Sequence, residues 1–178
     1  MSRLVPPVSA DDHRLGSESA PVTLVEYGDY ECPHCGRAAP ILREVQQRMG
    51  NRLRFVFRHF PLATMHPHAE PAAEAAEAAG AQERFWEMHH SLFAAQDALE
   101  EQDLLRRAAA LGLDVQRFAA DLESSVHAER VRRDFLSGVR SGVNGTPTLF
   151  VNGVRYDGEI DVASLLRGLE AIASGAAG

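Results

Sequence analysis

The hydrophobic pattern near the N-terminus alternates between strand-like and helix-like segments. Residues 22–27 form an almost continuous apolar run without a breaker, which is typical of a buried central strand. Residues 33–49 follow, and their apolar positions recur at spacings of three and four, which predicts an amphipathic helix. Residues 53–58 are again strand-like, with aromatic and β-branched side chains. The succession predicts a β-α-β unit, whose right-handed crossover makes the two strands parallel neighbours.

Between residues 63 and 141 only helical spacings occur. Gly80 and Gly112 each follow a run in which apolar residues recur at helical spacing. Asp114 is a suitable N-cap for the helix predicted after Gly112. These spacings predict five helices, with apolar faces built on Ala69/Ala72/Ala73/Ala76, Phe85/Met88/Leu92, Leu104/Leu105/Ala108, Val115/Phe118/Leu122 and Ala128/Val131/Phe135.

Strand patterns return near the C-terminus. Residues 148–151 and 154–156 are strand-like, and the Asn152-Gly153 pair between them favours a two-residue hairpin turn. Asp161 can cap a last amphipathic helix. The whole pattern predicts an α/β fold interrupted by an all-helical segment.

We therefore expect a core formed by residues 1–62 and 142–178, with residues 63–141 as an inserted helical subdomain. The first twenty residues are polar and contain prolines, so we expect a surface arm there, with a short strand around residues 4–8.

Composition narrows the function classes. The chain has 178 residues, 45% of them hydrophobic and 24% charged, as in ordinary globular proteins, and its net charge of -7 argues against a nucleic-acid surface. No apolar run is long enough to span a membrane, and the N-terminus lacks the apolar region of a secretory signal. We expect a cytoplasmic location on these grounds, with a processed, exported form as the alternative.

The two cysteines of the chain stand close together, in the stretch Cys32-Pro33-His34-Cys35. In a cytosolic setting such a pair is catalytic or metal-binding more often than structural. A metal site needs further ligands, which the histidines at 66, 68, 89, 90 and 127 could supply. We expect these histidines to be surface or core-edge residues, and we assign no metal ligand.

The position of the pair, after a strand and at the start of a helix, favours redox chemistry. Pro33 suits the first helical position, and the N–H groups and dipole of the helix N-terminus stabilise a thiolate at Cys32. His34, as an imidazolium or a hydrogen-bond donor, would stabilise it further. Cys32 is then the exposed nucleophile and Cys35 the resolving thiol. The charges of Asp29 and Glu31, just before Cys32, would partly oppose this effect.

A second feature is the stretch Gly145-Thr146-Pro147-Thr148, in which Pro147 opens a strand. A cis peptide bond there would let Thr146 offer its N–H and C=O to an extended peptide. Such bonds are usually trans, and the spacing alone leaves both isomers open.

Together, Cys32-Pro33-His34-Cys35 and Gly145-Thr146-Pro147-Thr148 resemble the DsbA family of the thioredoxin superfamily. The resemblance implies a thioredoxin fold, a mixed β-sheet flanked by helices, with a helical insertion. It also implies that Thr146-Pro147 is a substrate-binding cis-proline loop packed against the disulfide, and that Glu26 is a buried acid that moves a proton to or from Cys35. The Pro-His dipeptide is the pattern of oxidising members. The opening residues resemble a bacterial subset with soluble, membrane-attached and secreted members.

These observations predict a bacterial, soluble thiol-disulfide oxidoreductase that exchanges a Cys32–Cys35 disulfide with protein dithiols or low-molecular-weight thiols. We expect the oxidising direction, no organic cofactor, no nucleic-acid partner, and a monomer or a dimer. The alternatives are a thioredoxin-like reductase, a metal-binding or chaperone-like module on the same fold, and a glutathione-using enzyme, which usually lacks a resolving cysteine.

Overall fold

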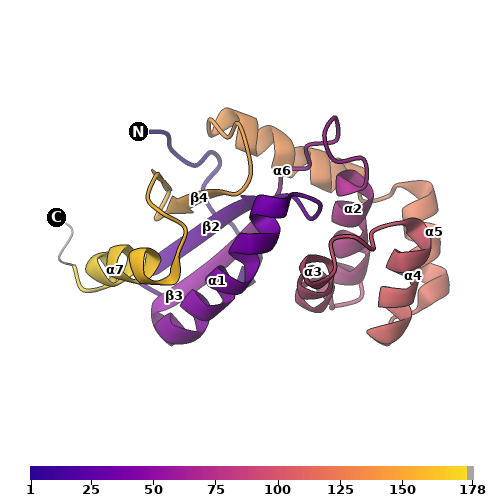
Figure 1. The fold of residues 1–178 in the computed structure, drawn as a ribbon, viewed down its shortest axis with the longest axis horizontal. Helices are drawn as coiled ribbons and strands as arrows, with labels where there is room; N and C mark the ends of the chain where they lie inside the picture. Colours follow the sequence, from indigo (N-terminus) through magenta and orange to yellow (C-terminus); the bar gives the residue numbers. More distant parts are fainter. Residues whose placement is uncertain (176–178) are drawn as a thin grey trace. The chain divides into compact units, whose positions relative to one another are not determined.

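The computed structural model describes residues 1–175 and divides the chain into two compact units (Figure 1). The first unit comprises Met1–Gly28, Arg37–Arg58 and Ser137–Gly178, and the second comprises Asp29–Gly36 and His59–Leu136. The subdomain boundaries expected at residues 62 and 142 stay a prediction, and residues 176–178 of the expected core lie outside the described part.

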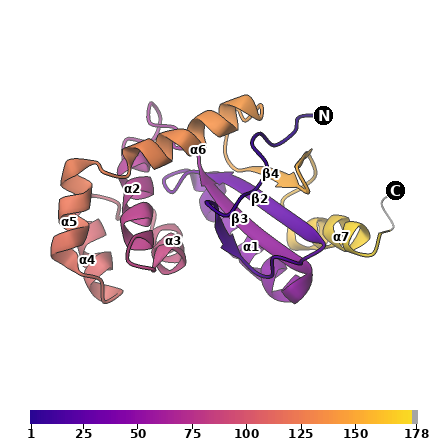
Figure 2. The same cartoon turned by 180° about the vertical axis from the view of Figure 1, so that it is seen from behind.

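A five-stranded sheet organises the first unit (Figure 2). Its strands stand in the order β1-β3-β2-β4-β5, so β2 and β3 are neighbours, as the crossover rule requires. The pairs β1–β3, β2–β4 and β4–β5 are antiparallel. The strands are β1 (His13–Leu15), β2 (Val22–Gly28), β3 (Leu53–His59), β4 (Thr148–Val151) and β5 (Val154–Tyr156).

The turn between β4 and β5 follows from its two residues. Asn152 and Gly153 both have positive φ, 47° and 81°, which matches the right-handed twist of a two-residue hairpin. Val151 therefore pairs with Val154, and the predicted hairpin is confirmed.

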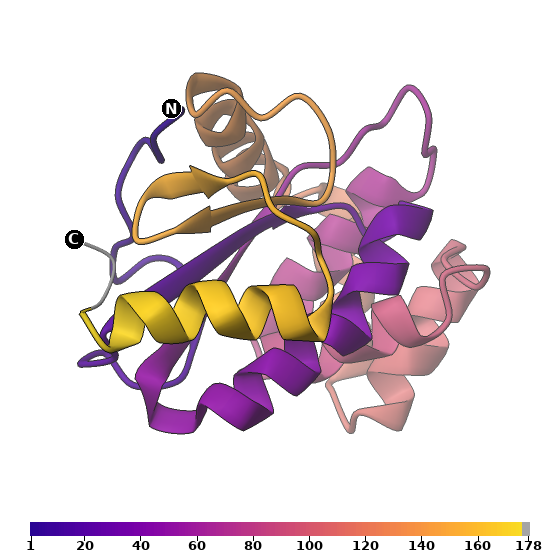
Figure 3. The ribbon, with the colours of Figure 1, turned by 60° about the vertical axis from the view of Figure 1, so that its left-hand side comes forward.

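Two helices of the first unit lie along the sheet (Figure 3). They are α1 (Pro33–Met49), which belongs to this unit from Arg37 onward, and α7 (Val162–Ala173). Asp161 caps α7 by accepting a hydrogen bond from the Ser164 N–H at 2.8 Å, as expected. The apolar faces of both helices are buried, through Leu42, Val45, Met49, Leu165 and Leu169.

The second unit is helical, and its five predicted helices are confirmed. Nearly every side of α2 is buried, because its alanines let neighbouring helices pack closely around it. Asp114 caps α5 by accepting from the Arg117 N–H at 3.0 Å. The helices are α2 (Ala69–Gly80), α3 (Phe85–Ala94), α4 (Glu101–Ala110), α5 (Val115–Ser124) and α6 (Ala128–Arg140), which continues into the first unit.

The N-terminal segment differs from the expectation. Residues 4–8 form no strand, and the nearest sheet contact is a single bridge between Arg3 and Val154. The strand lies later, at β1, which pairs with the edge of β3. A three-residue edge strand takes its conformation from its partner, so its own residues carry little signal.

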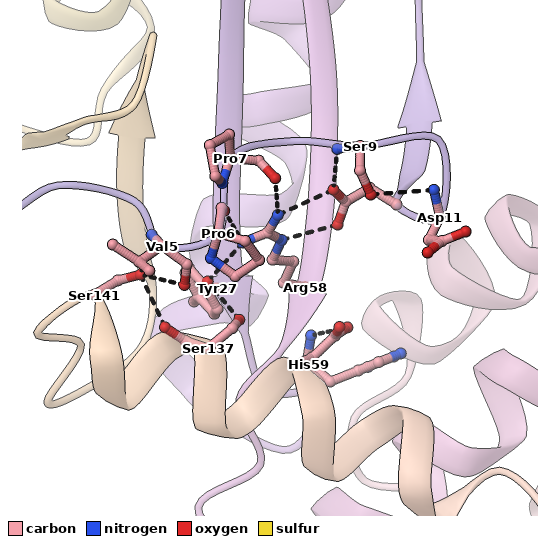
Figure 4. Close-up of polar contacts among 12 residues, drawn as sticks. Val5, Pro6, Pro7, Ser9, Asp11, Tyr27, Arg58, His59, Ser137 and Ser141 are labelled. Atoms are coloured by element: carbon pink, nitrogen blue, oxygen red, sulfur yellow. Dashed lines mark hydrogen bonds and ion pairs between the residues drawn. The ribbon is translucent and has the colours of Figure 1, made fainter.

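Arg58 of β3 holds this segment against the sheet (Figure 4). Its guanidinium donates to both carboxylate oxygens of Asp12, at 2.8 and 3.0 Å, and to the carbonyls of Pro6 and Pro7. It also donates to the Tyr27 hydroxyl at 3.0 Å. Burial alone would lower the pKa of Arg58, but the bonds to Asp12 and Tyr27 raise it above its ordinary range. The side chains of Arg58 and Asp12 are only 3% and 6% exposed, so they form a buried, bidentate ion pair.

Candidate active site

The cysteine pair occupies the first turn of α1. Pro33 is the first helical residue and Cys32 precedes it, so Cys32 stands at the helix N-terminus as the sequence predicts. The Gly36 N–H donates to the Cys32 carbonyl at 3.0 Å, which closes the first turn. Cys32 is 3% exposed and Cys35 is fully buried, so Cys32 is the more exposed thiol, but only slightly.

This placement favours a thiolate at Cys32. The first N–H groups of a helix have no partner within the helix, and they and the dipole attract a negative charge. His34 is exposed at the second helical position. The local geometry therefore gives Cys32 the environment of a reactive cysteine.

Asp29, three residues before Cys32, is the centre of a hydrogen-bond network. Its buried carboxylate accepts from the Glu31 N–H at 2.8 Å, the Leu62 N–H at 2.9 Å and the His66 Nδ1 at 2.7 Å. Its own carbonyl accepts from the Cys32 N–H at 3.2 Å. These bonds connect the redox segment, Asp29–Gly36, to the loop that follows β3.

The pKa of His66 is raised above its ordinary value of 6.5. Burial acts in the opposite direction, but the hydrogen bond and charge of Asp29 outweigh it, and the charges of Cys32 and Glu31 add to them. The raised pKa favours the charged form of His66, and the charge of Cys32 contributes to this shift.

Glu31 is paired in the same way. Its carboxylate accepts from the backbone N–H of His68 at 2.6 Å and from the His68 Nδ1 at 2.9 Å. The two acids in front of Cys32 are thus each bonded to a histidine. The expectation that Asp29 and Glu31 partly oppose the thiolate took no account of these histidines, which lie more than thirty residues further along.

Two side chains connect the redox segment to α3 and the loop after it. The Tyr30 hydroxyl lies 2.9 Å from the Nδ1 of the buried His89. The Gln96 amide nitrogen donates to the Tyr30 carbonyl at 3.0 Å and to the Cys32 carbonyl at 2.8 Å.

The remaining candidate residues lie in the first unit, where Glu26 is 2% exposed in β2 and faces Leu149 of β4 in the strand pairing. Pro147 stands two residues before Leu149, and the Thr146–Pro147 peptide bond is cis, as the resemblance implied. The Thr148 hydroxyl donates to the Gly145 carbonyl at 2.7 Å and orders this turn. Glu26 and the Pro147 turn thus belong to adjacent strands of one sheet.

Four of the five histidines considered as metal ligands take part in ordinary polar contacts. His66, His68 and His89 bond to Asp29, Glu31 and Tyr30, and the Nε2 of His127 lies 3.1 Å from a carboxylate oxygen of Asp121. Sequence reasoning missed that the first two of these face the redox segment. The available signal for these contacts was the stretch His66-Pro67-His68, in which a proline between two histidines favours a turn that presents both imidazoles. Nothing in the sequence marked Gln96.

Comparison with known proteins places these features in context. The family model described as thioredoxin matches residues 9–171, which is most of the chain.

Curated relatives are much longer than this chain. It is 49% identical over 172 residues to the Na(+)/H(+) antiporter NhaA 1 of Mycolicibacterium vanbaalenii, covering 95% of this chain and 28% of the antiporter. It is also 49% identical over 163 residues to the NhaA 1 antiporter of Salinispora arenicola, covering 91% of this chain and 25% of that protein. The chain thus spans little more than a quarter of the length of these relatives.

Solved structures match over nearly their whole length. BdbD from Bacillus subtilis has a TM-score of 0.80 and 26% identity, covering 92% of this chain and 94% of that one. A thioredoxin-like oxidoreductase from Silicibacter pomeroyi has a TM-score of 0.81 and 27% identity, covering 95% of each chain. The α-DsbA1 of Wolbachia pipientis, at 20% identity and a TM-score of 0.80 over 95% of this chain and 94% of that one, supports the fold alone.

The expectation of a cytoplasmic location is wrong. The matching solved structures include DsbA-type oxidoreductases, which are periplasmic or otherwise exported proteins. Among residues 1–175, no helix is both long and apolar enough to cross a membrane.

Proposed function

From the premise that the chain belongs to the thioredoxin family, in its DsbA-like branch, we propose that it is a thiol-disulfide oxidoreductase acting on protein thiols. The observation that carries the proposal is the position of Cys32 at the N-terminus of α1, and the raised pKa of the nearby His66 supports it. The proposed direction is oxidation of the substrate.

The exchange needs only the two cysteines and a substrate dithiol. A substrate thiolate attacks the Cys32 sulfur of the Cys32–Cys35 disulfide, a mixed disulfide forms, and Cys35 leaves as a thiolate. A second substrate thiolate then attacks the substrate sulfur of the mixed disulfide and releases the Cys32 thiolate. Two electrons pass from the substrate to the pair, and the substrate gains one disulfide.

The other residues receive supporting roles. Pro33 starts the helix. His34 stabilises the Cys32 thiolate when it is released from the mixed disulfide. By the family resemblance, Glu26 exchanges a proton with Cys35, and Thr146 and Pro147 bind the backbone of the substrate peptide. The burial of Glu26 and the cis bond before Pro147 support these two assignments.

The reduction potential of the pair tests the proposal. The pure protein is equilibrated with glutathione buffers, and the fraction of disulfide is measured by thiol alkylation. We expect a reduction potential of about -120 mV, in the range of strong oxidants. A value near about -270 mV would instead indicate a thioredoxin-like reductase. If no intramolecular disulfide forms, the proposed activity is wrong.

A trapping experiment tests which cysteine is the nucleophile. The C35S variant should form a lasting mixed disulfide with a peptide that contains a disulfide: the Cys32 thiolate attacks one peptide sulfur, the other leaves as a thiolate, and no resolving thiol remains to break the new bond. The matched C32S variant should form much less of it, since Cys35 lies within the first turn of α1 and lacks the helix N-terminal position of Cys32. Equal trapping by both variants would contradict the assignment of Cys32 as nucleophile.

We also propose that this domain works beside a sodium/proton antiporter. The support is the identity of about half the residues with a segment of such antiporters across nearly the whole chain. Antiport would be measured in vesicles containing a longer relative, with its redox pair held oxidised or reduced. A rate that depends on the redox state, and ceases to depend on it when both cysteines are serines, supports the proposal. An unchanged rate contradicts it.

A further inference from the structure

One side chain from the helical unit reaches the redox turn itself. Gln96 lies just beyond the end of α3, and its amide nitrogen donates to the carbonyls of Tyr30 and Cys32, at 3.0 and 2.8 Å. Both hydrogens of that amide are used on the segment that carries the nucleophile. The bonds join positions 64 and 66 residues apart in the sequence.

The Cys32 carbonyl has unusual importance for this turn. The peptide bond between Cys32 and Pro33 has no N–H, because Pro33 is a proline. Only the carbonyl oxygen can fix the plane of this peptide by hydrogen bonding. The donors that hold it are the Gly36 N–H, at 3.0 Å, and Gln96.

Gly36 shows how closely Gln96 is packed. A Cβ atom added at Gly36 would lie 2.0 Å from the Gln96 Oε1, 2.6 Å from its Cδ and 3.0 Å from its Nε2. Gly36 lies inside α1 and is not among the glycines with positive φ. Glycine is therefore needed at position 36 to leave room for Gln96, and not for its backbone freedom.

We propose that Gln96 is a positioning residue of the redox site: it fixes the Cys32–Pro33 peptide so that the Cys32 sulfur faces the N–H groups of the first turn of α1. The inference rests on the proposed function and deepens it. Loss of the two bonds leaves the sulfur in place on average, but lets the peptide rotate and weakens the electrostatic support of the thiolate.

The first test removes the amide. In Q96A, we expect a higher thiol pKa for Cys32, followed through the thiolate absorbance, and a roughly five-fold slower reaction with a model disulfide, as expected for the loss of about one net hydrogen bond. The matched control is Q82A, because Gln82 also bonds a backbone N–H and a carbonyl, both of Asp114, at 2.8 and 3.1 Å. Q82A should change neither quantity. An unchanged thiol pKa in folded Q96A would overturn the inference.

The second test uses the contact with Gly36. G36A should raise the thiol pKa and slow the reaction while Gln96 is present, because the new methyl group displaces the amide. In the Q96A background the same change should have no further effect, since the atoms closest to the added Cβ all belong to Gln96. If the effects of G36A and Q96A on the thiol pKa and on the reaction rate are additive in the double variant, the inference is wrong. If Q96A does not fold, Q96M fills the same volume without a donor and replaces it in the first test.

The two proposals fail separately. The thiol pKa of Cys32 can be measured by alkylation even in a protein that exchanges no disulfide. A wild-type protein without exchange activity contradicts the proposed function, whereas normal exchange together with an unchanged thiol pKa in Q96A contradicts only the role of Gln96.

Discussion

At the scale of single residues, the histidine held by Asp29 distinguishes this redox site from a bare cysteine pair. His66 bonds to Asp29 at 2.7 Å and interacts with the charge of Cys32. His68 bonds to Glu31 at 2.9 Å in a similar arrangement, two residues further on. The two histidines therefore form a natural comparison, and for His66 the charge of Cys32 contributes to a raised pKa.

Replacing His66 should weaken the thiolate. In H66Q, Asp29 loses the imidazole that lies 2.7 Å from its carboxylate and whose charged form would offset it, so we expect a higher thiol pKa for Cys32 and a several-fold slower reaction with disulfides near pH 6. H68Q is the matched comparison, in which both quantities should change less, because His68 and Glu31 are 40% and 20% exposed and solvent screens their charges. Thiolate absorbance against pH measures the first and stopped-flow mixing the second. If H66Q and H68Q have equal effects, the change comes from a general disturbance of the loop that carries both histidines and not from the charge of His66.

The same pair predicts a pH dependence of stability. Because the folded-state pKa of His66 is raised above 6.5, the charged imidazole contributes stability that is fully present below about pH 6.5 and is lost as pH rises through the raised value. The difference in unfolding free energy between wild type and H66Q should thus shrink as pH increases. Denaturant titrations between about pH 5 and pH 9 check this. A difference that grows with pH would be contrary to the assignment.

The sequence was sufficient to propose the reacting residues and insufficient to find the contacts around them. Cys32 and Cys35 could be proposed as the redox pair because a close pair at a strand-to-helix junction has few other uses. Gln96 and the pairing of His66 could not, because their contacts depend on how a loop more than thirty residues away returns to the motif.

At the scale of elements, the β4–β5 hairpin depends on one backbone conformation. Gly153 has φ of 81°, and an added Cβ there would meet no atom within 4 Å. G153A should therefore cost about 1–2 kcal/mol of unfolding free energy through conformation alone. Gly145 is equally open but has no positive φ, so G145A is the control and should cost much less. Chemical denaturation measures both, and similar costs would refute the conformational explanation.

The N-terminal segment depends on a buried ion pair. R58M should cost about 3 kcal/mol, because it leaves Asp12, whose side chain is 6% exposed, without its cation. Arg54 on the same strand donates to the Thr23 hydroxyl, at 3.1 Å, so R54M should cost less than about 1 kcal/mol. Denaturant midpoints give the costs, and limited proteolysis should show earlier cleavage before β1 in R58M. An undisturbed segment in R58M would show that other contacts hold it.

Most elements could be predicted, because their periodicity and end residues agree. The helix from Pro33 to Met49, the turn at Asn152-Gly153 and the caps at Asp114 and Asp161 are examples. β1 could not be predicted, since its strand character comes from pairing with β3.

At the scale of the whole molecule, the redox state should affect stability. An environment that stabilises the Cys32 thiolate in the folded protein favours the reduced form, so the reduced protein should unfold at higher denaturant than the oxidised one. Each 30 mV by which the potential of the folded pair exceeds that of the unfolded pair corresponds to about 1.4 kcal/mol. Unfolding with and without a reductant checks this, and the C32S/C35S double variant should not respond. A more stable oxidised form would argue against an oxidant.

The fold class could be predicted from the order of motifs, but the composition of the two units could not. The short segment Asp29–Gly36 groups with the helical residues and not with the strand that precedes it. The bonds of Asp29, Glu31 and Gln96 account for this, because each joins that segment to the loop before α2 or the loop after α3.

The contact between Gly36 and Gln96 also restricts how this site can be inherited. A descendant that acquires a side chain at position 36 first loses the anchor of its nucleophile, whereas one that first shortens position 96 can accept it afterwards. The order of the two changes therefore matters, and lineages that carry alanine or a larger residue at 36 should have arisen through ancestors already altered at 96. The residue that follows Cys35 and a loop position sixty residues away would then have changed together during evolution.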